Sequence, residues 1–236
     1  FSFQENLIID LRSNGGGLLN EAVKIVNFFV PKGELVVSTK SRNEQMNRSY
    51  YAREQPVDTI IPIVVLIDEM SASASEIVAG GIQDLDRGLV IGNNSYGKGL
   101  VQQTKQVNFG GQIKLTVAKY YTPSGRCIQK IDYSKDNGNS KKIEDSLVKK
   151  YNTKNGREVM DSRGIEPEIK IEPEYFNTIT EALLKDDIIF DYTNTNINNF
   201  LEDSLEPSIF QISDTTYEKF KKYVISKELN YQTASN

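Results

Sequence analysis

Histidine and tryptophan are both absent from the 236 residues of this chain, and cysteine occurs once, at Cys127. Without histidine, a nucleophilic serine would need a different base, and the imidazole ligands common in zinc sites are missing. A single cysteine cannot form an internal disulfide or a thiolate cluster. The sequence therefore predicts neither a metal site nor a bound cofactor.

Long apolar runs and net positive charge are also lacking. The longest apolar run, residues 60–67, contains Pro62 and is far shorter than the roughly 20 residues that cross a bilayer. The 28 Lys and Arg residues against 32 Asp and Glu residues give a net charge of −4, which argues against a nucleic-acid partner. Residues 1–6 lack the features of a signal peptide, and we expect the natural protein to begin earlier.

Short apolar runs alternate with stretches of helical spacing in the first half of the chain. Leu7–Leu11 is typical of a strand buried on both faces, and the glycine loop at residues 13–17 leads into a predicted helix, Leu18–Val30. A second helix is predicted over Ala72–Leu85. Further strands are predicted at Glu34–Thr39, Ile61–Ile67, Leu89–Gly92, Leu100–Val107 and Ile113–Tyr121. This alternation predicts an α/β fold of βαβ units with a largely parallel sheet.

Composition changes after Cys127. Residues 131–161 are rich in polar residues, so we expect an exposed insertion there, followed by a strand at Glu168–Ile171. The rest indicates a helical region with helices at Ile179–Leu184, Phe200–Leu205 and Thr216–Leu229, the last with capping-box spacing between Thr215 and Glu218. We therefore expect two domains, residues 1–174 and residues 175–236.

Ser73 opens the second predicted helix within a run of small residues. Ser73 and Glu76 have the spacing of a capping box, so a purely structural cap is one interpretation. The same position favours a nucleophile, because the N–H groups and dipole at a helix start stabilise an oxyanion. Ser71 and Ser75 compete for this role, and spacing does not choose among the three serines.

Lys98 lies between Gly97 and Gly99 and is either a surface turn residue or a base. To act as a base near neutral pH, its amine would need a pKa several units below the usual value of about 10.4. Burial among apolar groups is the available cause of such a decrease. Gln102 shares a strand face with the lysine and can help to position its amine, or is simply exposed. Asp84 lies on the helix face of Ser73 but too far along to touch it, so it supports the lysine or a loop, or is an ordinary polar helix end.

The loop from Asp10 to Gly17 follows the first strand and lacks the pattern of a phosphate-binding loop. Its glycine N–H groups, with the N–H of Ala74, are candidates for an oxyanion hole. Asp10 and Arg12 are expected to hold this loop in shape.

Four segments resemble, in order, those of the C-terminal processing peptidases, also called tail-specific proteases. They are Leu7–Leu19, Val64–Asp84, Gly88–Gln102 and Ile113–Gln129, followed by Gly164–Ile169. The resemblance implies a fold core shared with caseinolytic proteases and the crotonase family. It also implies a serine endopeptidase that cleaves proteins near their C-terminal tails through an acyl-enzyme.

The resemblance also implies roles for individual residues. Ser73 matches the nucleophile, Lys98 the general base and Gln102 the residue that orients the lysine, while Ala74 and the Gly16 region match the oxyanion hole. Such proteases usually carry a PDZ domain before this core, which residues 1–6 do not include. They commonly work in the bacterial periplasm or cell envelope, with protein or peptide tails as partners and with homo-oligomers possible.

Two other functions remain open on the residues. One is a non-catalytic peptide- or ligand-binding module on the same scaffold, in which Ser73 is only a cap. The other is acyl-CoA chemistry on the related fold, which the presence of both Ser73 and Lys98 disfavours. Fold alone does not separate them.

Overall fold

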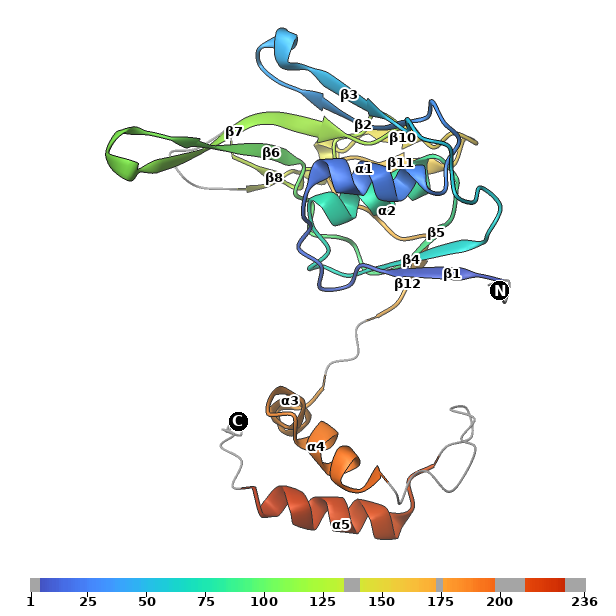
Figure 1. The fold of residues 1–236 in the computed structure, drawn as a ribbon, viewed down its shortest axis with the longest axis vertical. Coiled ribbons are helices and arrows are strands. Elements are labelled where there is room, and N and C mark those ends of the chain that lie inside the picture. Colours follow the sequence, from blue (N-terminus) through green and yellow to red (C-terminus); the bar gives the residue numbers. More distant parts are fainter. Residues whose placement is uncertain (1–4, 134–140, 173–175, 198–210, 228–236) are drawn as a thin grey trace. The chain divides into compact units, whose positions relative to one another are not determined.

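The computed structural model describes residues 5–133, 141–172, 176–197 and 211–227 (Figure 1). The chain divides into two compact units, residues 1–172 and residues 173–236. Among the residues described, no helix is long and apolar enough to span a membrane. The predicted α/β class with a helical C-terminal region is confirmed.

A parallel sheet forms one layer of the first unit. Its strand order is β1-β4-β5-β12, with β1 at Leu7–Asp10, β4 at Ile63–Ile67, β5 at Leu89–Gly92 and β12 at Ile169–Lys170. Helix α2 (Ala74–Asp84) joins the parallel strands β4 and β5, as a βαβ unit requires. The expectation that β1 is buried on both faces is wrong, since Ile8 is 64% exposed. Helices α2 and α1 (Leu19–Asn27) lie on one face of this sheet (Figure 1).

A second, antiparallel sheet lies on the other side of the helices (Figure 1). Its order is β3-β2-β7-β6, with β2 at Leu35–Lys40, β3 at Arg48–Tyr51, β6 at Leu100–Gln106 and β7 at Gln112–Tyr121. Strands β2, β6 and β7 were predicted, and β3 was not. The expectation that the predicted strands belong to a largely parallel sheet is wrong for these three. The turn Asn108–Gly110 between β6 and β7 is too short for a parallel crossover, so the two form a hairpin.

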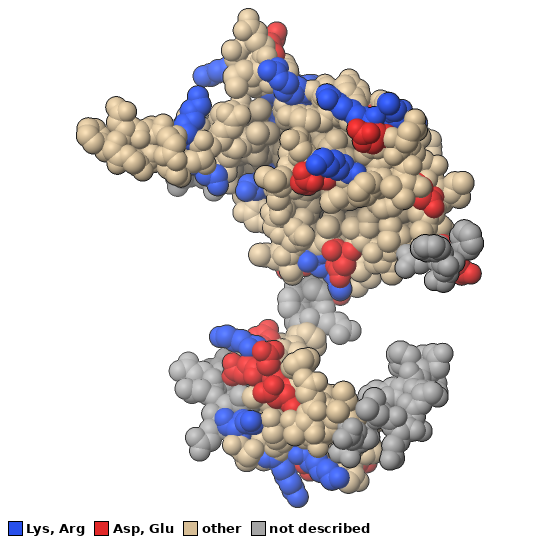
Figure 2. Space-filling model, viewed as in Figure 1, with Lys and Arg blue, Asp and Glu red and all other residues tan. Residues whose placement is uncertain are grey.

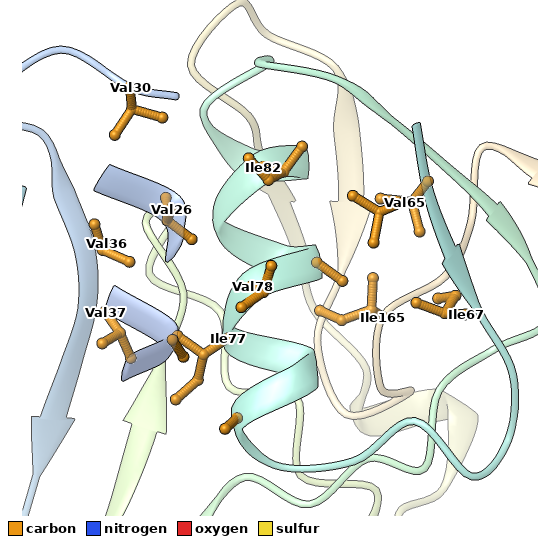
Figure 3. Close-up of a cluster of buried hydrophobic side chains, with 14 of the residues drawn as sticks. Val26, Val30, Val36, Val37, Val65, Ile67, Ile77, Val78, Ile82 and Ile165 are labelled. Atoms are coloured by element: carbon orange, nitrogen blue, oxygen red, sulfur yellow. The ribbon is translucent and has the colours of Figure 1, made fainter. Parts of the chain in front are cut away.

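The hydrophobic core surrounds α2, every residue of which is buried. Ile77, Val78 and Ile82 lie among side chains of both sheets and of α1 (Leu19–Asn27), as Figure 3 shows. A Cβ on Gly80 would lie 2.9 Å from Ile165 Cδ1, and one on Gly81 would lie 3.1 Å from Val26 Cγ2. The small residues of α2 are therefore needed because the helix is enclosed on all sides.

The expected exposed insertion at residues 131–161 is more structured than predicted. It contains β8 (Ile131–Asp132), β9 (Lys141–Lys142), β10 (Lys150–Asn152) and β11 (Glu158–Met160). β9 is exposed, but Val159 is 8% exposed, and Arg157 pairs with Asp86 at 2.6 Å and with Glu168 at 2.5 Å. The expectation of exposure is therefore wrong for the last part of the segment, because one buried valine and two ion pairs fasten it to the core.

Charged side chains of both signs are interspersed on the visible face of the first unit (Figure 2). Short pairs at the surface include Lys24 with Glu21 at 3.0 Å and Lys150 with Glu158 at 2.9 Å. The visible face thus carries no continuous basic stripe of the kind that binds a phosphate backbone.

The second unit contains three described helices, α3 (Thr178–Lys185), α4 (Ile188–Thr195) and α5 (Asp214–Ile225). Tyr192 of α4 packs against Phe220 and Tyr223 of α5, with ring centroids 5.1 and 5.2 Å apart. α3 and α5 were predicted. α4 was missed because its isoleucine, phenylalanine and tyrosine residues are typical of strands.

Two details of the predicted helical region have different outcomes. The helix predicted at Phe200–Leu205 lies outside the described residues. The prediction of a capping box between Thr215 and Glu218 is wrong. The N-cap of α5 is Ser213, whose side chain accepts from Thr216 N at 3.2 Å.

Candidate active site

Ser73 stands immediately before α2 in a conformation that serine rarely adopts, with φ 58° and ψ −113°. Such a backbone costs of order 1–3 kcal/mol and persists only where its surroundings determine it. Here Ser73 N donates to Glu76 Oε2 at 2.7 Å, and Ile77 N donates to Ser73 O at 3.1 Å. The strained turn places Ser73 at the start of the helix, where the dipole favours negative charge.

The three serines of this turn have different surroundings. Ser71 is fully buried and donates to Leu11 O at 2.7 Å, while Ser75 is 4% exposed and donates to Asn14 O at 3.0 Å. Both side chains tie the first loop to α2. Ser73 is partly exposed and is therefore the one of the three that a substrate can reach.

Gly16 lies against the turn of Ser73. Its φ is +101°, and a Cβ there would lie 2.5 Å from Ala72 O, 2.8 Å from Ala74 N and 2.9 Å from Ser73 Cβ. Only glycine fits this contact. The N–H of Gly16 donates to Asn14 Oδ1 at 3.0 Å, while Ala74 N belongs to the first helical turn, where N–H groups lack intrahelical acceptors. The structure therefore brings together the two predicted oxyanion residues.

The loop before Gly16 is held by two acidic residues. Asp10 accepts from Arg12 at both carboxylate oxygens, with distances of 2.9 and 2.7 Å. The side-chain and backbone hydrogen bonds from Arg12 lower the pKa of Asp10. Asp68 accepts from Ser13 N at 2.9 Å and from Ser71 N at 3.0 Å. Asp10 and Arg12 thus hold the loop in shape.

The buried carboxylate of Glu76 joins the turn of Ser73 to the turn of Lys98. Its Oε2 accepts from Ser73 N at 2.7 Å and from Lys98 N at 2.9 Å, and its Oε1 accepts from Ser95 Oγ at 2.6 Å and Gly97 N at 2.7 Å. Burial raises the pKa of Glu76, and the four hydrogen bonds oppose that shift. Glu76 is thus the cap partner that the sequence indicated, with three further donors from residues 95–98.

Tyr120 of β7 reaches the same two turns from the other sheet. Its hydroxyl lies 3.1 Å from Ser73 O and also donates to Lys98 O, and its side chain is 2% exposed. Burial raises the pKa of Tyr120 well above its usual value, and the charge of Glu76 adds to this effect. The phenol therefore stays protonated and available as a donor.

The two glycines beside Lys98 pack against residues 129–130. A Cβ on Gly97, whose φ is +84°, would lie 2.5 Å from Lys130 Cβ, and one on Gly99 would lie 2.8 Å from Gln129 N. Gly99 N donates to Gln129 Oε1 at 2.7 Å, and Lys130 N donates to Gly97 O at 3.0 Å. The turn is therefore fixed on both sides of the lysine, which is itself partly buried.

Lys98 and Gln102 line one cavity of about 810 Å³. They do not share a regular strand face as predicted, because Lys98 precedes β6 and the β6–β7 register is irregular between Val101 and Gln102. Most of the cavity wall is apolar, and residues of the first loop and of the segment after β7 contribute to it. The lining also includes Gly15, Met70, Ala72, Tyr96, Leu100, Thr116, Lys119, Gln129, Ile131, Asp132 and Tyr133. A cavity of this size with a few polar groups is suited to an extended peptide side chain or chain segment.

Asp84 lies at the far end of α2 and is not part of this cavity. It is 1% exposed, and it accepts from Arg126 at 2.8 Å and from Ser124 N at 3.1 Å. Its contacts therefore support the turn that follows β7. The suggestion that Asp84 reaches Lys98 is not supported by these contacts.

Among the residues that the structure describes, no group of three or more Cys, Asp or Glu side chains could hold a metal ion. Sequence reasoning missed Tyr120 and Gln129, since a tyrosine in a strand and a glutamine after it are usually core and surface residues. The glycines on either side of Lys98 were the available signal, because each requires a close neighbour.

Two family models match the chain. One is described as peptidase family S41 and matches residues 3–137, and the other is described as a probable PDZ-protease C-terminal helical domain and matches residues 179–236. The carboxy-terminal-processing protease of Bartonella bacilliformis is 45% identical over 129 residues, which cover 55% of this chain and 30% of that protein. The chloroplastic C-terminal processing peptidase of Tetradesmus obliquus is 39% identical over 130 residues, covering 55% and 28%.

A solved structure, the photosystem II D1 C-terminal processing protease, also matches. It superposes with a TM-score of 0.53 at 30% identity, over 75% of this chain and 37% of that one. The chain thus spans less than a third of the curated relatives named above.

Proposed function

Because the chain belongs to peptidase family S41, we propose that it is the catalytic part of a serine endopeptidase with Ser73 as nucleophile and Lys98 as base. The resemblance to C-terminal processing peptidases is confirmed by the matched family and relatives. One observation carries the proposal: a single oxygen of the buried Glu76 carboxylate accepts from both Ser73 N and Lys98 N. Ser73 and Lys98 are therefore neighbours, although the sequence separates them.

In the proposed reaction Ser73 Oγ attacks the carbonyl carbon of the scissile peptide, and its proton passes to the amine of Lys98. The tetrahedral intermediate collapses when the lysine returns that proton to the leaving amine, which leaves an acyl-enzyme. Water then repeats both steps on the ester, with Lys98 again taking and returning a proton. A lysine serves here because the chain has no histidine.

The negative charge of the intermediate is proposed to rest between Ala74 N and the Gly16 segment. Support comes from the helix start at Ala74 and from the tight contact of Gly16 with it. Gln102 is proposed to orient the lysine amine, since both residues line the same cavity. Its side chain is exposed in this structure, so we expect its effect to be smaller than that of Lys98.

The substrates are proposed to be proteins or peptides that present a C-terminal tail. The names of the two curated relatives and of the solved structure support this class of substrate. We further propose that the protein acts outside the cytoplasm, in the cell envelope of a bacterium, and forms a homo-oligomer. Fractionation of cells that express the tagged natural protein and its sedimentation in solution test the two points.

The catalytic proposal is tested on the intact natural protein with Ser73→Ala and Lys98→Ala. Removing a nucleophile or a general base is expected to lower the cleavage rate of a tail peptide by at least ~10²-fold. The matched controls are Ser146→Ala and Lys24→Ala, at exposed positions, which should cleave normally.

A fluorophosphonate probe should label wild type at Ser73 and leave the Ser73→Ala variant unlabelled. Unchanged cleavage by either active-site variant would contradict the assignment. A wild-type protein that binds tail peptides without cleaving them would favour the binding module.

A further inference from the structure

Tyr120 belongs to β7 of the antiparallel sheet, whereas Ser73 follows the parallel sheet and opens α2. The backbone N–H of Tyr120 donates to Gly99 O at 3.0 Å, so β7 contacts the turn of Lys98 directly. From this base the buried side chain extends to the point where the turns of Ser73 and Lys98 meet. The hydroxyl is the only part of the residue placed to interact with both reactive residues at once.

The hydroxyl of Tyr120 lies between two backbone carbonyl groups. It lies 3.1 Å from Ser73 O and contacts Lys98 O, so the carbonyl oxygens of both reactive residues face one donor. Ser73 O already accepts from Ile77 N at 3.1 Å, so the hydroxyl is a second donor there, and one shared proton holds this oxygen close to Lys98 O. Without the hydroxyl, we expect the two turns to move apart on this side.

Glu76 contacts the N–H groups of the same two residues. Its Oε2 accepts from Ser73 N and Lys98 N, whereas Tyr120 meets the carbonyl oxygens of those two residues. The carboxylate holds only the N–H side of Ser73 and of the lysine turn. Contacts on two sides fix both the separation of the two main chains and their relative orientation.

We propose that Tyr120 is a positioning residue for proton transfer, holding the backbone of Lys98 at a fixed distance from that of Ser73. This inference rests on the proposed peptidase function. Tyr120 touches neither substrate nor the reacting atoms, and acts through the two carbonyl groups. Because misplacement by about 1 Å can cost ~10²-fold in rate, a small movement of the turn is enough to lower kcat.

The test compares Tyr120→Phe with Tyr121→Phe in the intact natural protein. Tyr121 is the adjacent tyrosine, partly exposed and stacked under Lys40 at 4.5 Å, so its substitution controls for loss of a phenol from the same strand. We expect Tyr120→Phe to lower kcat by ~10- to 100-fold with KM within about twofold, and Tyr121→Phe to leave both unchanged. The rate of labelling of Ser73 by a fluorophosphonate should fall with kcat.

A merely structural role would lower the melting temperature and the folded fraction while leaving kcat per folded molecule unchanged, and that result would overturn the inference. Should Tyr120→Phe fail to fold, 4-aminophenylalanine and 4-methylphenylalanine at position 120 carry the test, since they are similar in length and differ in the donor. Retained kcat with the amino group and a loss with the methyl group are expected, and equal kcat would overturn the inference. If Ser73→Ala and Lys98→Ala still cleave, the peptidase proposal itself fails, whatever Tyr120 does.

Discussion

Replacing Glu76 by glutamine exchanges one carboxylate oxygen for an amide nitrogen, and the structure indicates which oxygen is lost. An amide nitrogen at Oε2 would face two backbone donors, Ser73 N and Lys98 N. At Oε1 it would face Ser95 Oγ, which can rotate to accept, and Gly97 N, which cannot. The amide should therefore settle with its nitrogen at Oε1, leaving one buried N–H without an acceptor.

One unsatisfied buried donor costs about 1–3 kcal/mol, so Glu76→Gln is expected to lower the free energy of unfolding by that amount. Glu76→Ala removes acceptors from all four donors and should cost at least about 4 kcal/mol, much of the ~5–15 kcal/mol that holds a typical domain together. Glu21→Gln is the control, because Glu21 is exposed and its pair with Lys24 contributes about 0.5 kcal/mol or less.

Urea unfolding at neutral pH, followed by tyrosine fluorescence in this tryptophan-free chain, measures the three variants. The expected order of destabilisation is Glu21→Gln, then Glu76→Gln, then Glu76→Ala. Cleavage by the folded fraction of Glu76→Gln should also decrease, because the loss at Gly97 loosens the turn that carries Lys98. If Glu76→Ala unfolds at the same urea concentration as the control, the four hydrogen bonds do not hold the two turns together and the argument fails.

Three further outcomes are expected. Gly16→Ala should lower the free energy of unfolding by ~1–3 kcal/mol and abolish fluorophosphonate labelling, since the new Cβ would lie 2.5 Å from a backbone oxygen. The control Gly15→Ala, whose Cβ would have no atom within 4 Å, should leave the stability and the labelling unchanged. Equal labelling of the two variants would count against the tight loop. Asp84→Ala should destabilise the protein by ~3–5 kcal/mol in urea titrations, because it leaves the buried Arg126 without its charge partner, and a loss below about 1 kcal/mol would contradict that role. Burial raises the pKa of the Cys127 thiol, so the folded protein holds less of the reactive thiolate at a given pH. Alkylation of Cys127 at neutral pH should therefore be much slower in the folded protein than in urea. Equal rates would show that the thiol is accessible.

Up to Tyr121 the sequence predicts the order and type of the helices and strands well, apart from β3, but not the sheets to which they belong. The segments Glu34–Thr39, Leu100–Val107 and Ile113–Tyr121 have the local signature of strands, and this signature is the same in parallel and antiparallel sheets. The short connection between the last two runs favours a hairpin, and connection length is the evidence that would have assigned them to an antiparallel sheet.

The candidate site is only partly visible in the sequence, for a similar reason. The spacing of Ser73 and Glu76 reveals the bond within one helix turn, whereas the bonds of Glu76 to residues 95–98 depend on how the chain folds back. The role of Tyr120 cannot be read from the sequence for the same reason, since nothing in the local sequence distinguishes it from Tyr121. The glycines at positions 16, 97 and 99 are visible, but the neighbours that make them necessary are not.

The arrangement around Ser73 and Lys98 suits the proposed use of lysine as a base. A lysine amine ends a flexible four-carbon chain, so fixing it requires first that its backbone be fixed. Here the bonds from Glu76 and Tyr120 go to main-chain atoms, which leaves the hydroxyl of Ser73 and the amine of Lys98 available for chemistry. The strained backbone of Ser73 is offset by the hydrogen bond that its N–H donates to Glu76. Gln129 and Lys130 also hold the lysine turn, but only the carboxylate and the phenol join it to the turn of Ser73 among the hydrogen bonds described above. Substitution of Glu76 or Tyr120 should therefore affect the rate more than it affects substrate binding.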